Sequence, residues 1–336
     1  MEKRGNKVLL GFLAFGVLTF LLAMVLKENH SVELSNEKPQ IENHSAEVNK
    51  DISITEPEPT IDDSVVDKQT ATQRNISLES YDLEVEDTPQ WKLPGRLEEI
   101  SGLAMTADNR LLAHNDEKAV IHEIDYINGV IVNEFQLADI KDPVTDDFEG
   151  IATAEDKVYL VTSSGRLYEC REGTAEESVL FNVYTTGVGR DYEIEGLTYD
   201  ESHRALLLMC KDARNEDLKD QLVIYFWSID KKHLMEDAHI VIPVIEFSRH
   251  IDEKNFQPSG IERHPVSGNY FVVAARQKAI AEITPTGQVV AAKQFPHGHR
   301  QAEGITFTAN STLIVADEGA GKKARLTLYP LPETAP

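Results

Sequence analysis

The chain has 336 residues, with 57 acidic against 33 basic side chains and a formal net charge of −24. Because nucleic acids are bound by clustered Lys and Arg, this balance argues against nucleic acid as a partner and favours a cation or a basic protein. The two cysteines, Cys170 and Cys210, are too few for a disulfide scaffold or a structural zinc site. An apolar content of 41% is sufficient for a large folded domain.

The first predicted element is a membrane-spanning helix. Residues 8–26 form an uninterrupted apolar run of 19, about the length needed to cross the hydrocarbon core. Lys3, Arg4 and Lys7 precede this run and an acidic segment follows it, so the positive-inside rule places residues 1–7 in the cytoplasm. A cleaved signal peptide is the alternative, although its apolar core is usually shorter. The sequence therefore predicts a single-pass signal-anchor in the inner (cell) membrane, with the remaining chain extracytoplasmic or periplasmic.

Residues 27–77 predict a linker. They contain no aromatic residue, show no sustained periodicity and carry more acids than bases. Such a segment cannot bury enough apolar surface to offset the entropy lost on ordering. We therefore expect a disordered acidic spacer between the membrane and a folded domain at residues 78–336, with a docking tail for a basic partner as the alternative.

A short pattern recurs five times between residues 97 and 330. Each copy has a polar residue, any residue, Glu or Ser, and then a glycine that opens an apolar strand; the glycines are Gly102, Gly150, Gly196, Gly260 and Gly304. A turn, a second strand, another turn and a third strand follow, as in residues 99–125. The glycines are 48, 46, 64 and 44 residues apart, close to the length of a four-stranded propeller blade.

The pattern predicts an all-β propeller with six blades, or five as the alternative. The long interval between Gly196 and Gly260 contains QLVIYFWSID and HIVIPVIEF, which form either a blade without the glycine or an extension of the preceding blade. The segment LESYDLEVEDTPQWKL alternates from Leu78 to Val85 and is expected to supply the outer strand that closes the ring against the C-terminal blade. No stretch between strands has ten residues of helical periodicity, which argues against a βαβ fold.

These repeats resemble the propellers of the SdiA-regulated family and, more distantly, phytase-type and other six-bladed propellers. The resemblance covers about residues 78–330 and depends on copies such as Ile100-Ser101-Gly102-Leu103 and Ala302-Glu303-Gly304-Ile305, followed by strands ending in Asn115-Asp116 or Asp317-Glu318. It implies an extracytoplasmic propeller with bound calcium as a further expectation. The family has no settled activity, so the resemblance implies little about chemistry.

The first strand of each propeller blade lines the central channel, so equivalent positions should converge as a ring. The sequence predicts metal ligands there and at the ends of second strands: Glu99, Glu149, Glu195, Glu303, Asp116 and Asp317. Ligand-binding candidates beside them are Ser101, Ser259, Gln257, Gln301 and Arg276. Oxygen-only ligation by carboxylates suits Ca²⁺ or Mg²⁺ better than zinc. The alternative is structural, with the acids bonding to backbone N–H groups and the glycines permitting close packing.

Other residues leave the chemistry open. Lys211, Arg276, Lys278 and Arg300 are candidates to hold an anionic substrate group, and ion pairing with the acidic ring explains them equally well. Cys170 and Cys210 fall on strands of neighbouring repeats, as a disulfide or as buried free thiols. The chain lacks a G-x-S-x-G elbow, an H-E-x-x-H motif and a P-loop.

Two functions fit these observations. The first is a membrane-anchored binding propeller that recognises a ligand or partner at its channel mouth, with a calcium ion as organiser. The second is a metal-dependent hydrolase of phosphoesters or lactones, in which a carboxylate such as Glu149 or Glu303 activates water.

Overall fold

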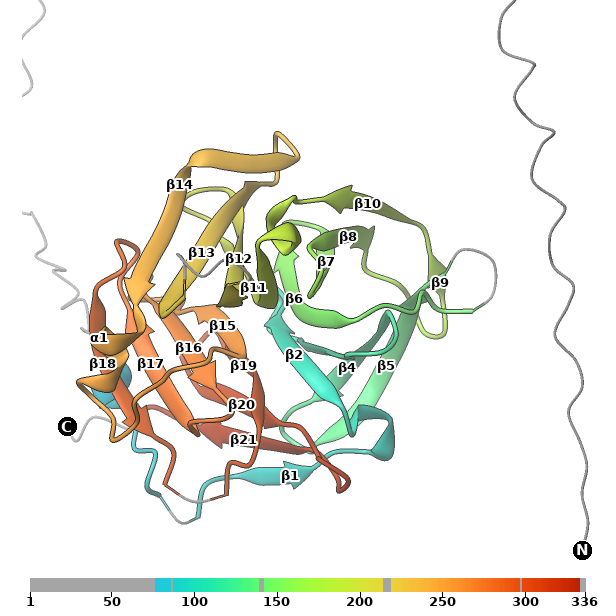
Figure 1. The fold of residues 1–336 in the computed structure, drawn as a ribbon. Helices are drawn as coiled ribbons and strands as arrows, with labels where there is room; N and C mark the ends of the chain where they lie inside the picture. Colours follow the sequence, from blue (N-terminus) through green and yellow to red (C-terminus); the bar gives the residue numbers. More distant parts are fainter. Residues whose placement is uncertain (1–75, 86, 139–141, 214–218, 297, 333–336) are drawn as a thin grey trace, which may run out of the picture. The chain divides into compact units, whose positions relative to one another are not determined.

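The computed structural model describes residues 76–85, 87–138, 142–213, 219–296 and 298–332. In these residues the strands form five sheets that follow one another around a closed ring (Figure 1). Each sheet begins at one of the five glycine repeats, and its first strand lies innermost. The domain is therefore an all-β, five-bladed propeller.

In four blades, four antiparallel strands follow one another in chain order from the channel outward. The first contains β2 (Ile100–Met105), β3 (Leu111–Asn115), β4 (Val120–Asp125) and β5 (Val130–Leu137), with β9 (Ser178–Val179) added in parallel. The second contains β6 (Phe148–Ala154), β7 (Lys157–Thr162), β8 (Arg166–Arg171) and β10 (Phe181–Thr185). The third contains β11 (Tyr192–Asp200), β12 (Ala205–Ala213), β13 (Gln221–Ser228) and β14 (His233–Pro243). The fourth contains β15 (Gly260–Arg263), β16 (Tyr270–Ala274), β17 (Ala279–Ile283) and β18 (Val289–Gln294).

The preferred count of six blades is wrong, and the alternative count of five is confirmed. The two strands in the long interval are β13 and β14, the outer strands of the third blade. The interval is long because β11, β12 and β14 have 9, 9 and 11 residues. Pro243 ends β14, and the following residues, predicted as strand, form the short helix α1 (Val244–Ser248) with Val244 and Phe247 buried.

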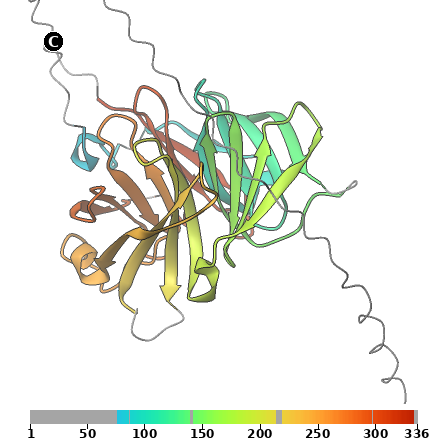
Figure 2. The same cartoon turned by 90° about the horizontal axis from the view of Figure 1, so that it is seen from above.

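The fifth blade joins the two ends of the domain. It contains β19 (Ala302–Phe307), β20 (Leu313–Asp317), β21 (Arg325–Tyr329) and the outer strand β1 (Gln90–Lys92), which pairs with β21 (Figure 1). Figure 2 shows the same propeller turned by 90°. The predicted closure is confirmed, but the alternating stretch from Leu78 to Val85 is not the strand. It contains the 3₁₀ turn η1 (Leu78–Ser80), and its buried residues Leu78, Tyr81 and Leu83 pack against the fourth and fifth blades.

The blades are held together by apolar packing. Five clusters of buried side chains in the described residues are each shared by two neighbouring blades, as where Phe135 of the first blade meets Phe148 of the second. Burial of this kind contributes roughly 25 cal/mol for each Å² of apolar surface. Cys170 and Cys210 belong to two of these clusters as free thiols, so the disulfide alternative is not observed.

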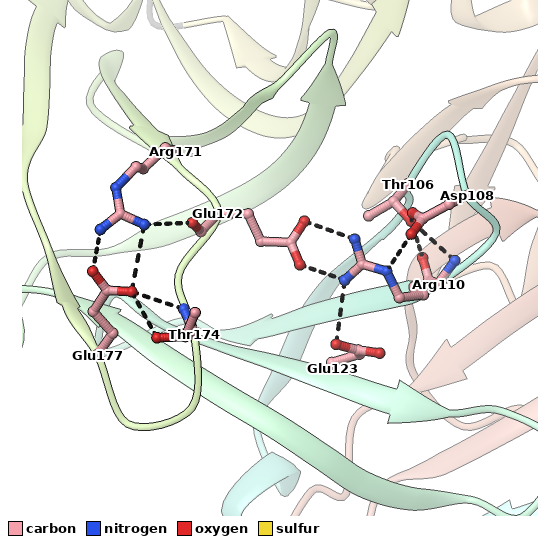
Figure 3. Close-up of polar contacts among 8 residues, drawn as sticks. All are labelled: Thr106, Asp108, Arg110, Glu123, Arg171, Glu172, Thr174 and Glu177. Atoms are coloured by element: carbon pink, nitrogen blue, oxygen red, sulfur yellow. Dashed lines mark hydrogen bonds and ion pairs between the residues drawn. The ribbon is translucent and has the colours of Figure 1, made fainter.

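Charged contacts add a smaller contribution between the first two blades (Figure 3). Arg110, in the turn between β2 and β3, donates from Nη2 to Oε2 of Glu172 at 2.9 Å and from Nε to Asp108 at 2.8 Å. Arg171 pairs with Glu177 in the loop that follows β8. Because these side chains are partly exposed, solvent screens each pair and limits it to at most about 1 kcal/mol.

The repeated glycines allow the inner strands to approach one another. A Cβ atom on Gly150 would lie 2.7 Å from the backbone nitrogen of Leu197, and one on Gly260 would lie 2.4 Å from the backbone oxygen of Glu303. A Cβ on Gly304 would meet Leu103 at 2.7 Å. At these positions each glycine packs against the inner strand of the next blade, beside the repeated glycine of that strand. The inner strands are therefore parallel and in register around the channel.

We expect the Gly150→Ala variant to be destabilised by about 1–3 kcal/mol, because the added methyl group overpacks a backbone that cannot move aside. Gly95→Ala is the matched control, since a Cβ there has nothing within 4 Å. Denaturant unfolding of both variants measures the difference. Equal stability of the two variants would contradict the role assigned to the glycines.

Among the described residues no helix is long and apolar enough to cross a membrane. The predicted span at residues 8–26, and the predicted linker up to residue 75, lie outside the described residues.

Candidate functional site

In each blade the residue immediately before the repeated glycine lies at one end of the channel, either within the inner strand or directly before it. These ring residues are Ser101, Glu149, Glu195, Ser259 and Glu303. In four blades the pairing register shifts by one at the ring residue, as between Phe148 and Gly150, which marks a β-bulge. A bulge re-aims the side chain of its extra residue and is frequent next to functional sites. The bulges therefore distinguish the ring residues from ordinary channel-lining positions.

Behind the ring, the channel is closed by apolar side chains. The residue after each glycine is buried in the channel, and these residues are Leu103, Ile151, Leu197, Ile261 and Ile305. The space left among them and the ring is about 10 Å³, too small for a ligand. The ring therefore lies at a mouth of the channel and not along a continuous pore.

Three ring glutamates make this mouth strongly acidic. Burial raises the pKa of Glu149 to about 9, with the charges of Glu195, Asp147 and Glu303 adding to the effect. Burial and Glu195 raise the pKa of Glu303 to about 8. Burial also raises the pKa of Glu195 to about 7, although Lys211 opposes the shift. Carboxyl groups with such pKa values resist ionisation together unless a cation compensates them.

Lys211 of β12 is the cation nearest to these glutamates among the described residues. Its Nζ lies 2.9 Å from Oε1 of Glu195, an ion pair that is largely shielded from solvent. The position of Lys211 confirms the ion-pairing alternative from the sequence for this residue. One lysine cannot neutralise three carboxylates, so the mouth retains an excess of negative charge when the glutamates ionise.

Further acids surround the ring and continue the mouth outward. The charge of Asp116, together with burial, raises the pKa of Glu99. Burial and then Glu117 raise the pKa of Asp116, and burial and then Asp116 raise that of Glu318. We call the ring residues together with Glu99, Asp116 and Glu318 the acidic mouth.

The predicted ligand-binding residues are already engaged to different degrees. Ser101 is buried and donates to Glu149 at 3.5 Å, a weak contact at the limit of hydrogen-bond distance. Ser259 is saturated, because it donates to the carbonyl of Ala302 at 2.7 Å and accepts from the N–H of Ala275 at 3.0 Å. Gln257 accepts from Arg276 at 3.2 Å, and Gln301 donates to Glu318.

Asp317, predicted as a metal ligand, instead fixes a loop. Its Oδ1 accepts from the backbone N–H groups of Arg300 at 2.8 Å and Gln301 at 3.2 Å. Its Oδ2 lies 2.8 Å from Nδ1 of His299, and both side chains are buried. In the described part of the chain, no three His, Cys, Asp or Glu side chains lie close enough together to hold one metal ion.

The opposite mouth was not predicted from the sequence. It is a cavity of about 510 Å³ at the far ends of the inner strands, with one channel-facing residue from each blade: Met105, Thr153, Tyr199, Arg263 and Phe307. Glu262 also lines it, and burial raises its pKa to about 8. The sequence did contain a signal for this cavity, because each of the five residues stands three places after a repeated glycine. The five side chains differ in chemistry, so the shared spacing does not stand out.

No protein-family model and no curated protein matches the chain. Among solved structures it is similar to a Bacteroides caccae protein of unknown function, with 14% identity and a TM-score of 0.38, over 62% of this chain and 64% of that one. It is also similar to a Myxococcus xanthus glutaminyl cyclase, with 14% identity and a TM-score of 0.48, over 72% and 93% of the two chains. For the PQQ-bound aldose sugar dehydrogenase of Streptomyces coelicolor the identity is 13% and the TM-score 0.44, over 72% and 98%. Similarity at this level does not assign the activities of these proteins to this chain.

The raised pKa values of the ring glutamates predict how stability depends on pH. Between about pH 4.5 and 9 the folded state holds more protons than the unfolded state, so stability falls as pH rises through this window. Glu149→Gln removes one ionising group, and we expect it to flatten this decline and to be more stable than the wild type at pH 9.

Glu253→Gln is the matched control, because Glu253 is exposed. Thermal unfolding across pH 5–9 measures both variants. A uniform loss of stability in Glu149→Gln at every pH would indicate instead that the carboxylate acts as a structural hydrogen-bond acceptor.

Proposed function

We propose that the protein is a binding propeller whose acidic mouth takes up a divalent cation, with calcium as the first candidate, and presents it to a ligand or partner. The observation that carries this proposal is the convergence of Glu149, Glu195 and Glu303 from three blades, with Lys211 as the counter-charge found among the described residues. Calcium prefers carboxylate oxygens and tolerates irregular geometry, which suits ligands that come from separate strands.

The energetic argument is one of charge compensation. Two unit charges at 4 Å interact by about 4 kcal/mol at the effective dielectric typical near a protein surface. A divalent cation at the mouth would favour the ionised form of all three glutamates and so lower their pKa values. Its binding should therefore release protons near neutral pH and strengthen as pH rises.

The spacing of the carboxylates constrains the mode of binding. Because no three described carboxylates lie within ligating distance of one point, the ion would retain water ligands or draw the glutamates inward. Water-mediated contacts leave exchangeable positions on the ion. Such positions are where a ligand's carboxylate, phosphate or hydroxyl oxygens would bind.

The cellular setting is part of the same proposal. The predicted span at residues 8–26 would hold the propeller on the outer side of the inner membrane, and the repeat pattern supports membership of the SdiA-regulated family. An extracytoplasmic location favours calcium, since this ion is scarce in the cytoplasm.

We expect Ca²⁺ to raise the melting temperature of the full-length chain in neutral detergent relative to chelator, with Mg²⁺ less effective. A ligand at 100 times its Kd stabilises the folded state by about 2.7 kcal/mol, or roughly 5–10 °C for a domain of this size. Glu149→Gln should remove most of the shift, whereas Glu253→Gln should retain it. Unchanged melting temperatures with Ca²⁺, Mg²⁺ and Zn²⁺ would refute the cation site.

One observation favours a hydrolase as the second candidate. Glu149 and Glu195 have pKa values of about 9 and 7, so at neutral pH one is protonated and the other is partly ionised. Neighbouring carboxyls with separated pKa values can act as general acid and general base. With a divalent cation polarising the scissile group, this pair would serve the hydrolysis of a phosphoester or lactone.

Turnover of model phosphoesters and lactones in the presence of Ca²⁺ or Mg²⁺ distinguishes the two functions. A hydrolase should lose at least about 100-fold in kcat when Glu195 is replaced by Gln, with its melting temperature retained. If the wild-type protein binds the cation but turns over none of these substrates, the result would support the binding function and contradict the hydrolase.

A further inference from the structure

A second pocket lies at the seam where the ring closes. It has a volume of about 260 Å³ and is formed by three segments of the fifth blade and its surroundings. Five of its eight residues are basic, and the complete set is Lys92, Gly298, Arg300, Asp317, Glu318, Lys322, Lys323 and Arg325. We call it the basic pocket. It is exceptional in a chain whose net charge is −24.

The five basic side chains have no carboxylate within ion-pair distance in the described residues, although Asp317 is the cross-strand neighbour of Arg325 in the β20–β21 pairing. Elsewhere, arginines such as Arg96, Arg166 and Arg204 are paired with nearby carboxylates, as expected where acids are abundant. Within the described residues, by contrast, no basic side chain of the pocket forms an ion pair. Arg325 donates only to Gln90 and to the carbonyl of Gly298, each at 3.2 Å.

The two acids of the pocket neutralise only part of this positive charge. Asp317 is occupied by backbone N–H groups of the loop before β19, and Glu318 accepts a hydrogen bond from Gln301. Asp317 thereby fixes the loop that carries Arg300. Both acids keep their negative charges, so the pocket has five cationic side chains against two carboxylates and retains an excess of positive charge.

The ring closure places two positive charges directly opposite each other. In the pairing of β1 with β21, Lys92 is the cross-strand partner of Arg325. Directly opposed like charges in a sheet are destabilising, so this pair weakens the closure on its own. An anion between the two side chains would convert the repulsion into two attractions.

The hairpin that carries the two remaining lysines is held in a defined turn. Lys322 donates its backbone N–H to the carbonyl of Gly319 at 3.0 Å, and the two central residues, Ala320 and Gly321, have φ values of 45° and 79°. Positive φ at both positions is the type I′ geometry, which is rare for alanine and is found where local structure over-determines the backbone. The turn places Lys322 and Lys323 in the lining of the pocket.

We infer that the basic pocket binds a phosphate-type oxyanion, held by Lys92, Arg300, Lys322, Lys323 and Arg325, and that the bound anion strengthens the closure of the propeller. The guanidinium groups offer paired donors that match phosphate oxygens, and the lysines add point charges. A volume of about 260 Å³ accommodates a phosphate with part of an attached group. The phosphate source is either a soluble phosphorylated molecule or an anionic lipid headgroup.

The first test uses inorganic phosphate with the full-length chain in neutral detergent, at constant ionic strength with chloride as the replacement ion. Phosphate at 10–50 mM should raise the melting temperature by roughly 2–4 °C. Lys92→Glu places a carboxylate opposite Arg325, so this variant should melt roughly 1–3 °C above the wild type without phosphate and gain little from phosphate. Lys254→Glu is the control, because Lys254 is exposed and lies outside the pocket, and it should keep the full phosphate shift.

A second variant isolates the anion site from the closure. The double substitution Lys322→Ala and Lys323→Ala leaves the β1–β21 pairing intact, so its melting temperature without phosphate should match that of the wild type while the phosphate shift is lost. A phosphate shift of equal size in this variant, or none in the wild type with either phosphate source, would overturn the inference.

The source of the phosphate is resolved in liposomes that contain the full-length chain. A stabilisation seen with phosphatidylglycerol and not with phosphatidylcholine, in phosphate-free buffer, assigns the site to a lipid headgroup. Stabilisation in phosphatidylcholine on addition of glycerol phosphate assigns it to a soluble ligand.

Discussion

The close approach of the inner strands at the five repeated glycines is the constraint on which the rest of the molecule depends. A Cβ atom at Gly150, Gly260 or Gly304 would come within 2.7 Å of the next blade or closer. This approach sets the inner strands in register, fills the channel with Leu and Ile side chains and leaves no space for a pore. The residue before each glycine is therefore placed at the same level in every blade.

The electrostatics of the acidic mouth follow from that geometry. Ring residues that are remote in sequence share one end of a narrow, apolar channel, so burial and mutual repulsion act on the same carboxyls. In four blades a bulge at the ring residue interrupts regular pairing, a local irregularity that a purely structural ring has no need to repeat. The close approach of the inner strands thus also brings the ring glutamates together. A bound cation would reduce the repulsion between them.

The two ends of the domain meet at a site of positive charge, in contrast to the acidic mouth. The closure between β1 and β21 is short and brings Lys92 opposite Arg325, in a blade whose β20–β21 hairpin carries further lysines. An otherwise acidic domain therefore has an excess of positive charge at the seam where its two ends meet. The acidic mouth and the basic pocket share Glu318 at their border, so ligands of opposite charge would bind close to one another.

The sequence was sufficient for the propeller fold because its signal is repeated. Each glycine predicts an inner strand, and the second and third strands observed in most blades lie where the apolar segments indicate. Blade number was missed because strand length varies between blades, and β14 alone has 11 residues. The alternation from Leu78 to Val85 was misleading because its buried residues pack against neighbouring blades without joining a sheet.

The candidate site was predicted only in part. A repeat shows which residues occupy equivalent positions in the blades, but it does not show which neighbouring groups form hydrogen bonds with them. Glu149, Glu195 and Glu303 are brought together as expected. The roles of Asp317 and Ser259 depend on hydrogen bonds to loops and to an adjoining blade, which have no counterpart in the repeat pattern. The basic pocket depends on strand pairing between residues 90–92 and 325–327, which are far apart in the sequence.

The glycine-set register brings the ring glutamates to one mouth, where burial raises their pKa values far above the ordinary range. The most direct measurement is an NMR titration of the carboxyl carbons of ¹³C-labelled glutamate, with Glu149, Glu195 and Glu303 assigned through their Gln variants. We expect these three glutamates to titrate between about pH 7 and 9, well above the ordinary glutamate value of 4.5. Titration of all three near pH 4.5 would show that the mouth is open to solvent and that its carboxylates do not act on one another.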